Sequence, residues 1–139
     1  MHPLEAKAFI LAQLEPDRGV GEPQTFLGAL RPYRHILPRQ QFHGIMRALR
    51  VLVPTLSGGP LVDRELVSAL WSLCELTRLC CVDEDTALRR DRLISAEDLA
   101  LLRRWHNMVC YAVMIILETG DDAEAFHEYD RYCAEDPPP

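Results

Sequence analysis

The sequence has no uninterrupted apolar stretch long enough to cross a lipid bilayer. The longest, Met108–Leu117, has ten residues, whereas a membrane-spanning helix needs roughly 18 to 20. The first residues, Met1–Lys7, lack the basic, apolar and small-residue segments of a secretory signal. We therefore expect a cytoplasmic protein with no membrane partner.

The sequence patterns of common catalytic and cofactor sites are also missing. There is no Gly-x-Ser-x-Gly nucleophile elbow, no phosphate-cradling glycine loop and no dinucleotide-binding fingerprint. Glu124 and His127 have the Glu-x-x-His spacing of di-iron bundles, but the second copy that such a site needs is absent. No Cys-x-x-Cys or paired histidine spacing indicates zinc. We expect neither a catalytic residue nor a metal or cofactor.

Five cysteines are present, an odd number, and two of them are adjacent: Cys74, Cys80, Cys81, Cys110 and Cys133. At least three lie in strongly apolar helical segments, which favours buried, reduced thiols over disulfides. A cysteine nucleophile, Cys74 or Cys110 with His106 or His43 as its base, is a weaker alternative. Spacing does not exclude it, because such groups assemble in space rather than along the chain.

Helical periodicity extends over almost the whole chain, and no stretch alternates as a strand does. Caps and breakers place helices at Pro3–Leu14, Gln24–Leu30, Pro38 to the Ser57–Pro60 turn, Leu61–Val82, Ser95–Glu118, and beyond Asp121 or Asp122. Pro54 and that turn are expected to end the third helix, and Arg89–Arg92 is expected to be a charged connector. The sequence thus predicts an all-α, compact antiparallel bundle of five main helices plus one short helix. We expect residues 1–136 to form a single domain and residues 137–139 a disordered tail.

Two segments carry the clearest patterns. In the helix after Pro38, apolar residues recur every three or four positions, and the opposite, polar face carries Arg39, His43, Arg47 and Arg50. In the helix beginning at Ser95, the segment Met108–Leu117 is apolar on all sides. That segment is expected to be the central buried helix of the bundle, or to have one face covered by a partner.

Charge is the most informative property of the chain. Arginines outnumber lysines fourteen to one, which we take as a sign of a GC-rich bacterial genome. Pro23–Val62 has a net charge of +5 although the whole chain has −6, and Glu118–Asp136 has −7. The basic and acidic segments either face each other within the fold or form docking surfaces, since patches of one sign steer partners and fix their orientation.

The leading functional prediction is a small protein-interaction module, such as a bacterial immunity or regulatory protein. Its predicted partner-binding residues lie on the two charged segments: Arg39, His43, Arg47, Arg50, Asp121, Asp122, Glu124, Glu128 and Asp130. One alternative is a ligand-binding or metal-binding bundle, formed as a homodimer that buries part of Trp105–Leu117. An enzyme or metalloprotein would draw on His43, His106, Glu124 and His127. A third reading, nucleic-acid binding through Arg31–Arg50, is disfavoured by a pI of about 5.3.

Overall fold

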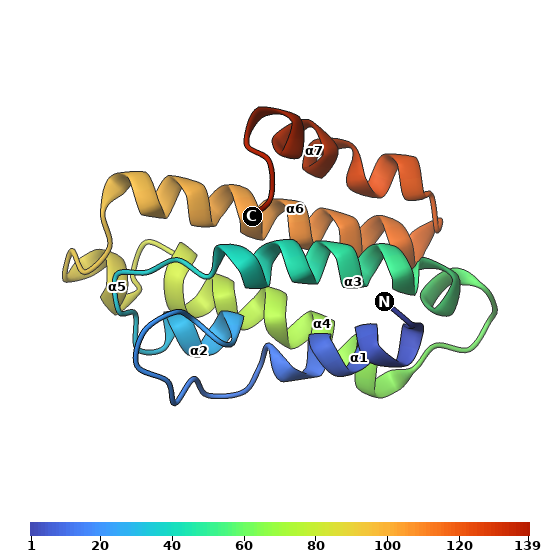
Figure 1. Cartoon of the computed structure of the whole chain (residues 1–139), viewed down its shortest axis with the longest axis horizontal. Coiled ribbons are helices and arrows are strands. Elements are labelled where there is room, and N and C mark those ends of the chain that lie inside the picture. The colour runs from blue at the N-terminus through green and yellow to red at the C-terminus, as the bar shows by residue number, and fades with distance from the viewer.

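Successive long helices run in alternating directions and pack side by side, as the computed structural model of residues 1–139 shows (Figure 1). The helices are α1 (Pro3–Ala12), α2 (Phe26–Leu30), α3 (Arg39–Ser57), α4 (Arg64–Thr77), α5 (Ala87–Arg90), α6 (Ala96–Glu118) and α7 (Asp122–Glu135). A π-helical turn, η1 (Arg78–Val82), continues α4. The predicted all-α antiparallel bundle with five main helices is confirmed. No helix is long and apolar enough to cross a membrane.

Local sequence signals set most of the helix starts. The Ser95 hydroxyl accepts a hydrogen bond from the Asp98 N–H at 3.1 Å, and Asp121 caps α7 through the Glu124 N–H at 3.0 Å. These caps satisfy backbone donors that a first helical turn leaves free. The expected charged connector instead contains a short helix, α5, because the Thr86 hydroxyl caps it in the same manner.

Helix α3 differs from expectation at Pro54. The helix continues through this residue and ends at Ser57, where the predicted turn begins. Proline has a helical φ, and its main cost in a helix is the loss of one N–H donor and crowding of the preceding turn. The helix therefore lacks one hydrogen bond at Pro54 and still continues for three more residues.

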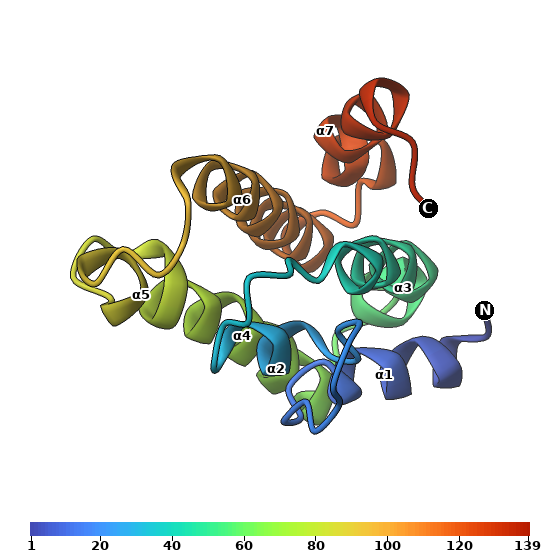
Figure 2. The same ribbon diagram turned by 60° about the vertical axis from the view of Figure 1, so that its left-hand side comes forward.

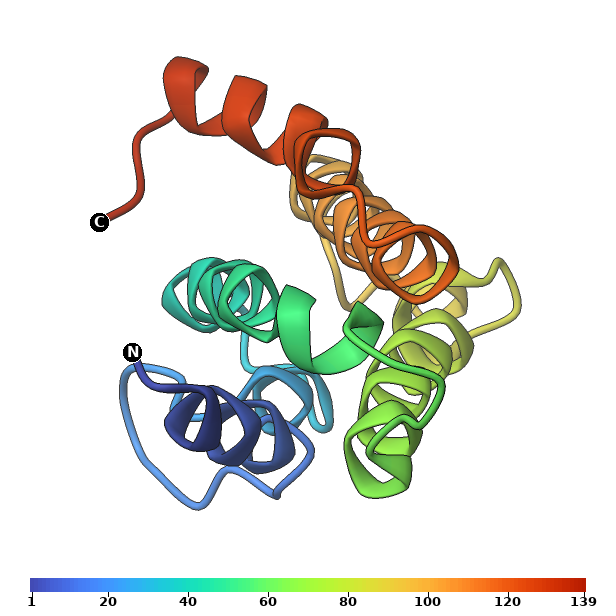
Figure 3. The same ribbon diagram turned by 90° about the vertical axis from the view of Figure 1, so that its right-hand side faces the viewer.

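The core lies where α3 packs against α1 on one side and against α6 and α7 on the other (Figures 2 and 3). Its largest fully buried side chains include Phe42, Trp105 and Phe126. The Phe42 and Trp105 rings stack with their centroids 4.9 Å apart. Helix α4 packs against another side of α6. This arrangement leaves α3 and α6 as the two most central helices.

Two predictions about helix faces need correction. His43, expected on the polar face of α3, is only 1% exposed because α7 lies over it. Helix α6 is central but not enclosed on all sides, since Tyr111, Met114 and Leu117 are 41%, 44% and 38% exposed. Part of the apolar segment Met108–Leu117 therefore lies at the surface. This exposure is compatible with the alternative prediction that a partner covers one face of the helix.

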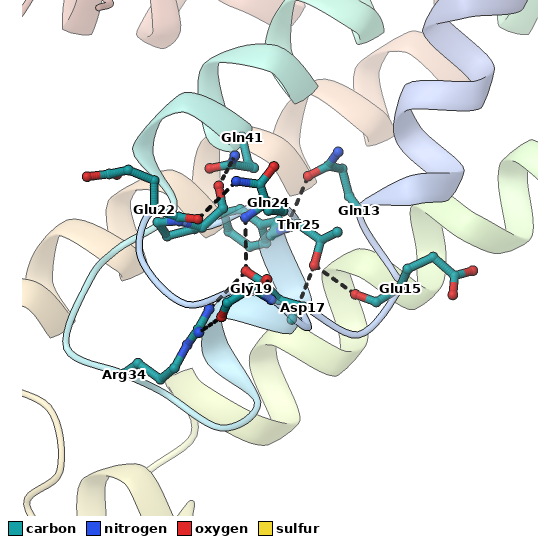
Figure 4. A network of polar contacts seen from close by, with 12 residues as sticks. Gln13, Glu15, Asp17, Gly19, Glu22, Gln24, Thr25, Arg34 and Gln41 are labelled. Carbon is teal, nitrogen blue, oxygen red and sulfur yellow. Dashed lines mark hydrogen bonds and ion pairs between the residues drawn. The ribbon is translucent and has the colours of Figure 1, made fainter.

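The loop between α1 and α2 is fixed by a polar network centred on Asp17 (Figure 4). Its carboxylate is fully enclosed, accepts the N–H groups of Gly19 and Gln24, and pairs with Arg34 at 3.1 Å. The Gln24 and Gly19 N–H groups hold the pKa of Asp17 below its usual value. This network holds the start of α2 against the end of α1.

Candidate functional site

The basic face of α3 and the acidic helix α7 pair with each other inside the fold. Arg39 donates to the Asp136 carboxylate at 2.6 Å and to the Pro137 carbonyl at 3.0 Å. Arg50 binds both oxygens of Asp130, at 2.8 and 2.9 Å, and lies 3.6 Å from Asp122. Of the two arrangements that the sequence left open, pairing within the fold is the one present. Four of the predicted partner-binding residues take part in this internal pairing: Arg39, Arg50, Asp122 and Asp130.

The other predicted partner-binding residues have different surroundings. Arg47 is exposed and makes no ion pair. Asp121 caps α7, Glu124 accepts a hydrogen bond from the Tyr111 hydroxyl at 3.0 Å, and Glu128 pairs with Arg131 at 3.0 Å. Asp121, Glu124 and Glu128 therefore form an exposed acidic row along α7 that no arginine of α3 neutralises. We call these three residues the acidic row.

An aromatic cluster holds α7 against α3 and α6. The His43 Nδ1 atom lies 2.9 Å from the Tyr129 hydroxyl, and the Trp105 indole donates to the Tyr132 hydroxyl at 3.1 Å. The Tyr132 hydroxyl in turn donates to Asp136 at 3.3 Å. These buried polar contacts fix α7 in one orientation, because each polar group would be left unsatisfied if the helix rotated.

A surface groove of about 560 Å³ separates α6 from the docked α7. This volume falls in the range of roughly 300 to 1,000 Å³ typical of ligand sites. Most of the lining is apolar, and its charged members are one arginine and one glutamate. The lining residues are Arg104, Asn107, Met108, Cys110, Tyr111, Met114, Ala125, Glu128 and Tyr129.

The groove combines an apolar floor with an acidic edge. Met108 and Ala125 are buried, Met114 and Tyr111 are exposed at the rim, and Glu124 and Glu128 of the acidic row border it from α7. Methionine side chains are flexible and polarisable, so a surface that contains them adapts to different apolar shapes. The arrangement suits reversible binding of an apolar or amphipathic group.

A cluster of three sulfur and nitrogen groups lies beside the groove. Cys110 lines the groove, and its Sγ atom lies 3.3 Å from Nε2 of His106, one helical turn earlier. From α4, the Cys74 carbonyl lies 2.9 Å from the same His106 nitrogen, and the Cys74 side chain lowers the pKa of Cys110. Two cysteines and a histidine that the sequence singled out are thus brought together, whereas His43 lies with Tyr129 instead.

The other residues considered for metal chemistry are not assembled. His127 is exposed, and Glu124 is engaged with Tyr111. No group of three or more histidine, cysteine, aspartate or glutamate side chains is arranged to hold a metal ion.

Sequence reasoning missed most of the groove lining. Arg104 and Asn107 line it only because α7 packs beside α6, and pairing of these two helices leaves no local signature. Glu128 was predicted as a partner-binding residue from charge alone. The apolar character of Met108–Leu117 on all sides was the other signal, and it allowed either a central buried helix or a face covered by a partner. Comparison of the chain with protein-family models, with curated proteins and with solved structures found no match.

Proposed function

We propose that this protein is a binding module whose groove between α6 and α7 accepts an amphipathic helix of a partner protein. The observation that carries the proposal is the groove itself, an apolar floor of helical-bundle side chains left open beside the acidic row. Catalysis is a weaker candidate for the groove, because Cys110 is the one thiol in its lining and no histidine lines it.

The spacing of the exposed side chains on α6 supports a helical partner. Asn107, Tyr111, Met114 and Glu118 are exposed and recur every three or four residues, so they form one ridge along α6. A partner helix can lie along such a ridge and insert apolar side chains at its own positions i, i+3 or i+4, and i+7.

Charge indicates the chemistry of the partner. The acidic row faces solvent, and Glu118 adds a further exposed carboxylate at the end of α6. Arg104, the basic residue of the lining, is paired with Glu135 at 3.3 Å. A partner helix with lysines or arginines beside its apolar stripe would complement this edge.

This mode of binding fits the predicted regulatory or immunity role in a bacterial cytoplasm. An acidic surface that captures a basic helix can cover a basic active site, and it needs no catalytic residue on the inhibitor. Because Arg39 and Arg50 pair with α7 inside the fold, we propose that the outer face of α7 is the binding edge and that the basic face of α3 belongs to the scaffold.

Selection from a displayed library of about 16-residue random peptides tests the proposal, since such a peptide spans roughly four helical turns. We expect enrichment of amphipathic sequences that carry basic residues beside an apolar stripe, with micromolar affinity in fluorescence polarisation. Met114→Glu should weaken binding at least about tenfold, because it places a charge against the apolar stripe. Glu124→Lys with Glu128→Lys should weaken the basic peptides selectively.

Leu79→Glu is the matched control, because Leu79 is a similarly exposed apolar residue that does not line the groove. It should leave peptide affinity unchanged. Enrichment of acidic or non-helical sequences, or equal binding to the Met114→Glu variant, would contradict the proposal. Concentration-dependent dimerisation lost in Met114→Glu would instead identify a second copy of this chain as the occupant.

A further inference from the structure

The hydrogen on His106 Nε2 can be placed from geometry. This nitrogen lies 2.9 Å from the Cys74 carbonyl oxygen, which can only accept a hydrogen bond. Nε2 must therefore carry the hydrogen, whatever the charge of the ring. The Cys110 sulfur lies 3.3 Å from the same nitrogen and therefore accepts a hydrogen bond from it rather than donating one.

A sulfur that faces an N–H donor is stabilised as the thiolate. The Cys74 thiol, followed by the His106 imidazole, lowers the pKa of Cys110 below that of an ordinary thiol, although burial opposes this. Burial also opposes a charge on His106, but the contacts with Cys110 and Cys74 raise the pKa of that ring. The thiolate is the reactive form of cysteine towards peroxides and electrophiles.

We propose that Cys110 and Cys74 are a peroxide-sensitive thiol pair that closes into a disulfide between α6 and α4. Cys110 lines the groove, so a small hydroperoxide reaches it from solvent. The Cys74 carbonyl on α4 and the Cys110 sulfur on α6 contact the same His106 nitrogen, so the two cysteines lie side by side between these helices. The inference does not depend on what the groove binds.

The first step is oxidation of Cys110 by hydrogen peroxide. The thiolate attacks one peroxide oxygen, so that an S–O bond forms while the O–O bond breaks. The departing hydroxide takes up a proton and leaves as water. Cys110 becomes a sulfenic acid, oxidised by two electrons, and the peroxide is reduced.

The second step is attack by the Cys74 sulfur on the Cys110 sulfenic acid. The S–S bond forms, the S–O bond breaks, and the hydroxide combines with the Cys74 proton as a second water. The Cys110 side chain is the largest cause of the raised pKa of Cys74, ahead of burial. Oxidation of Cys110 removes its negative charge, so Cys74 then loses its proton more easily.

The remaining cysteines lack this arrangement. Cys81 is fully buried, and burial raises its pKa to about 12. The Cys133 side chain lies near Tyr129 of the aromatic cluster and, after burial, raises the pKa of that tyrosine. The cysteine that hydrogen-bonds to a histidine side chain is Cys110, not Cys80. Selective oxidation of one pair among five cysteines is therefore expected.

The test treats the intact protein with about one equivalent of hydrogen peroxide near neutral pH, alkylates the remaining thiols and maps disulfides by mass spectrometry. We expect a Cys74–Cys110 disulfide, with the other three cysteines recovered alkylated. Cys74→Ser should stop the reaction at a Cys110 sulfenic acid that dimedone traps, and Cys110→Ser should abolish both products. The matched control, Cys80→Ser, should still form the disulfide. Equal oxidation of all accessible cysteines, or dimedone labelling spread over them, would overturn the proposal.

A separate measurement tests the positioning role of His106. The rate of Cys110 alkylation by iodoacetamide is followed against pH, and its midpoint reports where the thiolate forms. At about pH 6, wild-type Cys110 should react at least about tenfold faster than free cysteine in solution, since an ordinary thiol with a pKa near 8.5 is almost fully protonated there. His106→Gln keeps an N–H donor but cannot become charged, so it should move the midpoint upwards. An unchanged midpoint in a folded His106→Gln variant would contradict the assigned role.

Discussion

Gly28 lies where the start of α2 crosses the loop that follows α1. A Cβ atom built at this position would lie 2.3 Å from the backbone nitrogen of Asp17 and 2.6 Å from the Asp17 Cβ atom. Both neighbours are fixed, because the Asp17 carboxylate is held by two backbone N–H groups and Arg34. At the residue scale, this close approach is what lets the Asp17 network join α1 to α2.

Gly28→Ala is therefore expected to destabilise the fold by about 1–3 kcal/mol, as other overpacked substitutions do. Chemical denaturation followed by circular dichroism measures this change. Gly59→Ala is the matched control, since a Cβ atom there meets nothing within 4 Å. That control should remain within about 0.5 kcal/mol of wild type. A Gly28→Ala variant as stable as the control would show that the loop yields easily.

At the scale of single elements, docking of α7 depends on a histidine that burial keeps neutral. Burial, followed by the charges of Arg39 and Arg47, lowers the pKa of His43, whereas Asp136 raises it. Its Nε2 atom is buried without a hydrogen-bond partner, and its Nδ1 atom meets the Tyr129 hydroxyl. Protonation would add a charge and an unsatisfied N–H to the contact between α3 and α7.

The sign of the resulting pH dependence follows from linkage. Because the pKa of His43 is lower in the folded than in the unfolded state, the unfolded chain takes up the proton first as pH falls. Stability should decline below the ordinary histidine pKa of about 6.5 and level off below the folded-state pKa, with a slope of at most ~1.4 kcal/mol per pH unit. Urea denaturation between about pH 7.5 and 5 measures this, and His43→Gln should remove the His43 part of the slope.

Exposed His127 provides the comparison for this experiment. His127→Gln changes an exposed side chain of the same helix and controls for the loss of a histidine as such. Hydrogen exchange should show α7 amides losing protection before those of α1 as pH falls. Identical slopes in wild type and His43→Gln would mean that His43 is not the group responsible.

The helices themselves were predictable because their signals are local. Ser95 and Asp121 cap the helices that the sequence assigned to them, and Pro54 was misread only because α3 has one turn left after it. The orientation of His43 was not predictable. Its helical spacing placed it with Arg39 and Arg47, and only contact with Tyr129 of α7, 86 residues away, buries it.

For the molecule as a whole, the sequence revealed the separation of charge but not where the two charged segments lie. Net charges of +5 and −7 are compatible with two docking surfaces or with one internal contact, because composition contains no information on distance. The fold resolves this by placing α7 across α3 and α6 (Figure 3). The groove exists for the same reason, since one wall is α6 and the other is α7.

The internal charge contact leads to a prediction for the whole bundle. Arg50 binds Asp130 and also lies over the Phe126 ring, with its guanidinium carbon 4.4 Å from the ring centre. Both side chains of the ion pair are partly exposed, so we expect a coupling of only about 0.5–1 kcal/mol in a double-mutant cycle of Arg50→Ala and Asp130→Ala. In about 0.5 M salt, screening should reduce this coupling, whereas the Phe126 contact should still make Arg50→Ala destabilising on its own.

A cycle between Arg50 and Glu97 is the control, because Glu97 is an exposed acid in the first turn of α6 and has no contact with Arg50. Its coupling should be zero within error. Coupling between Arg50 and Asp130 means that part of the charge separation stabilises the docking of α7, and therefore the groove that α7 completes. If the coupling between Arg50 and Asp130 is also zero, the two charged segments keep their full charge for a partner. The basic face of α3 then becomes a second docking surface beside the acidic row.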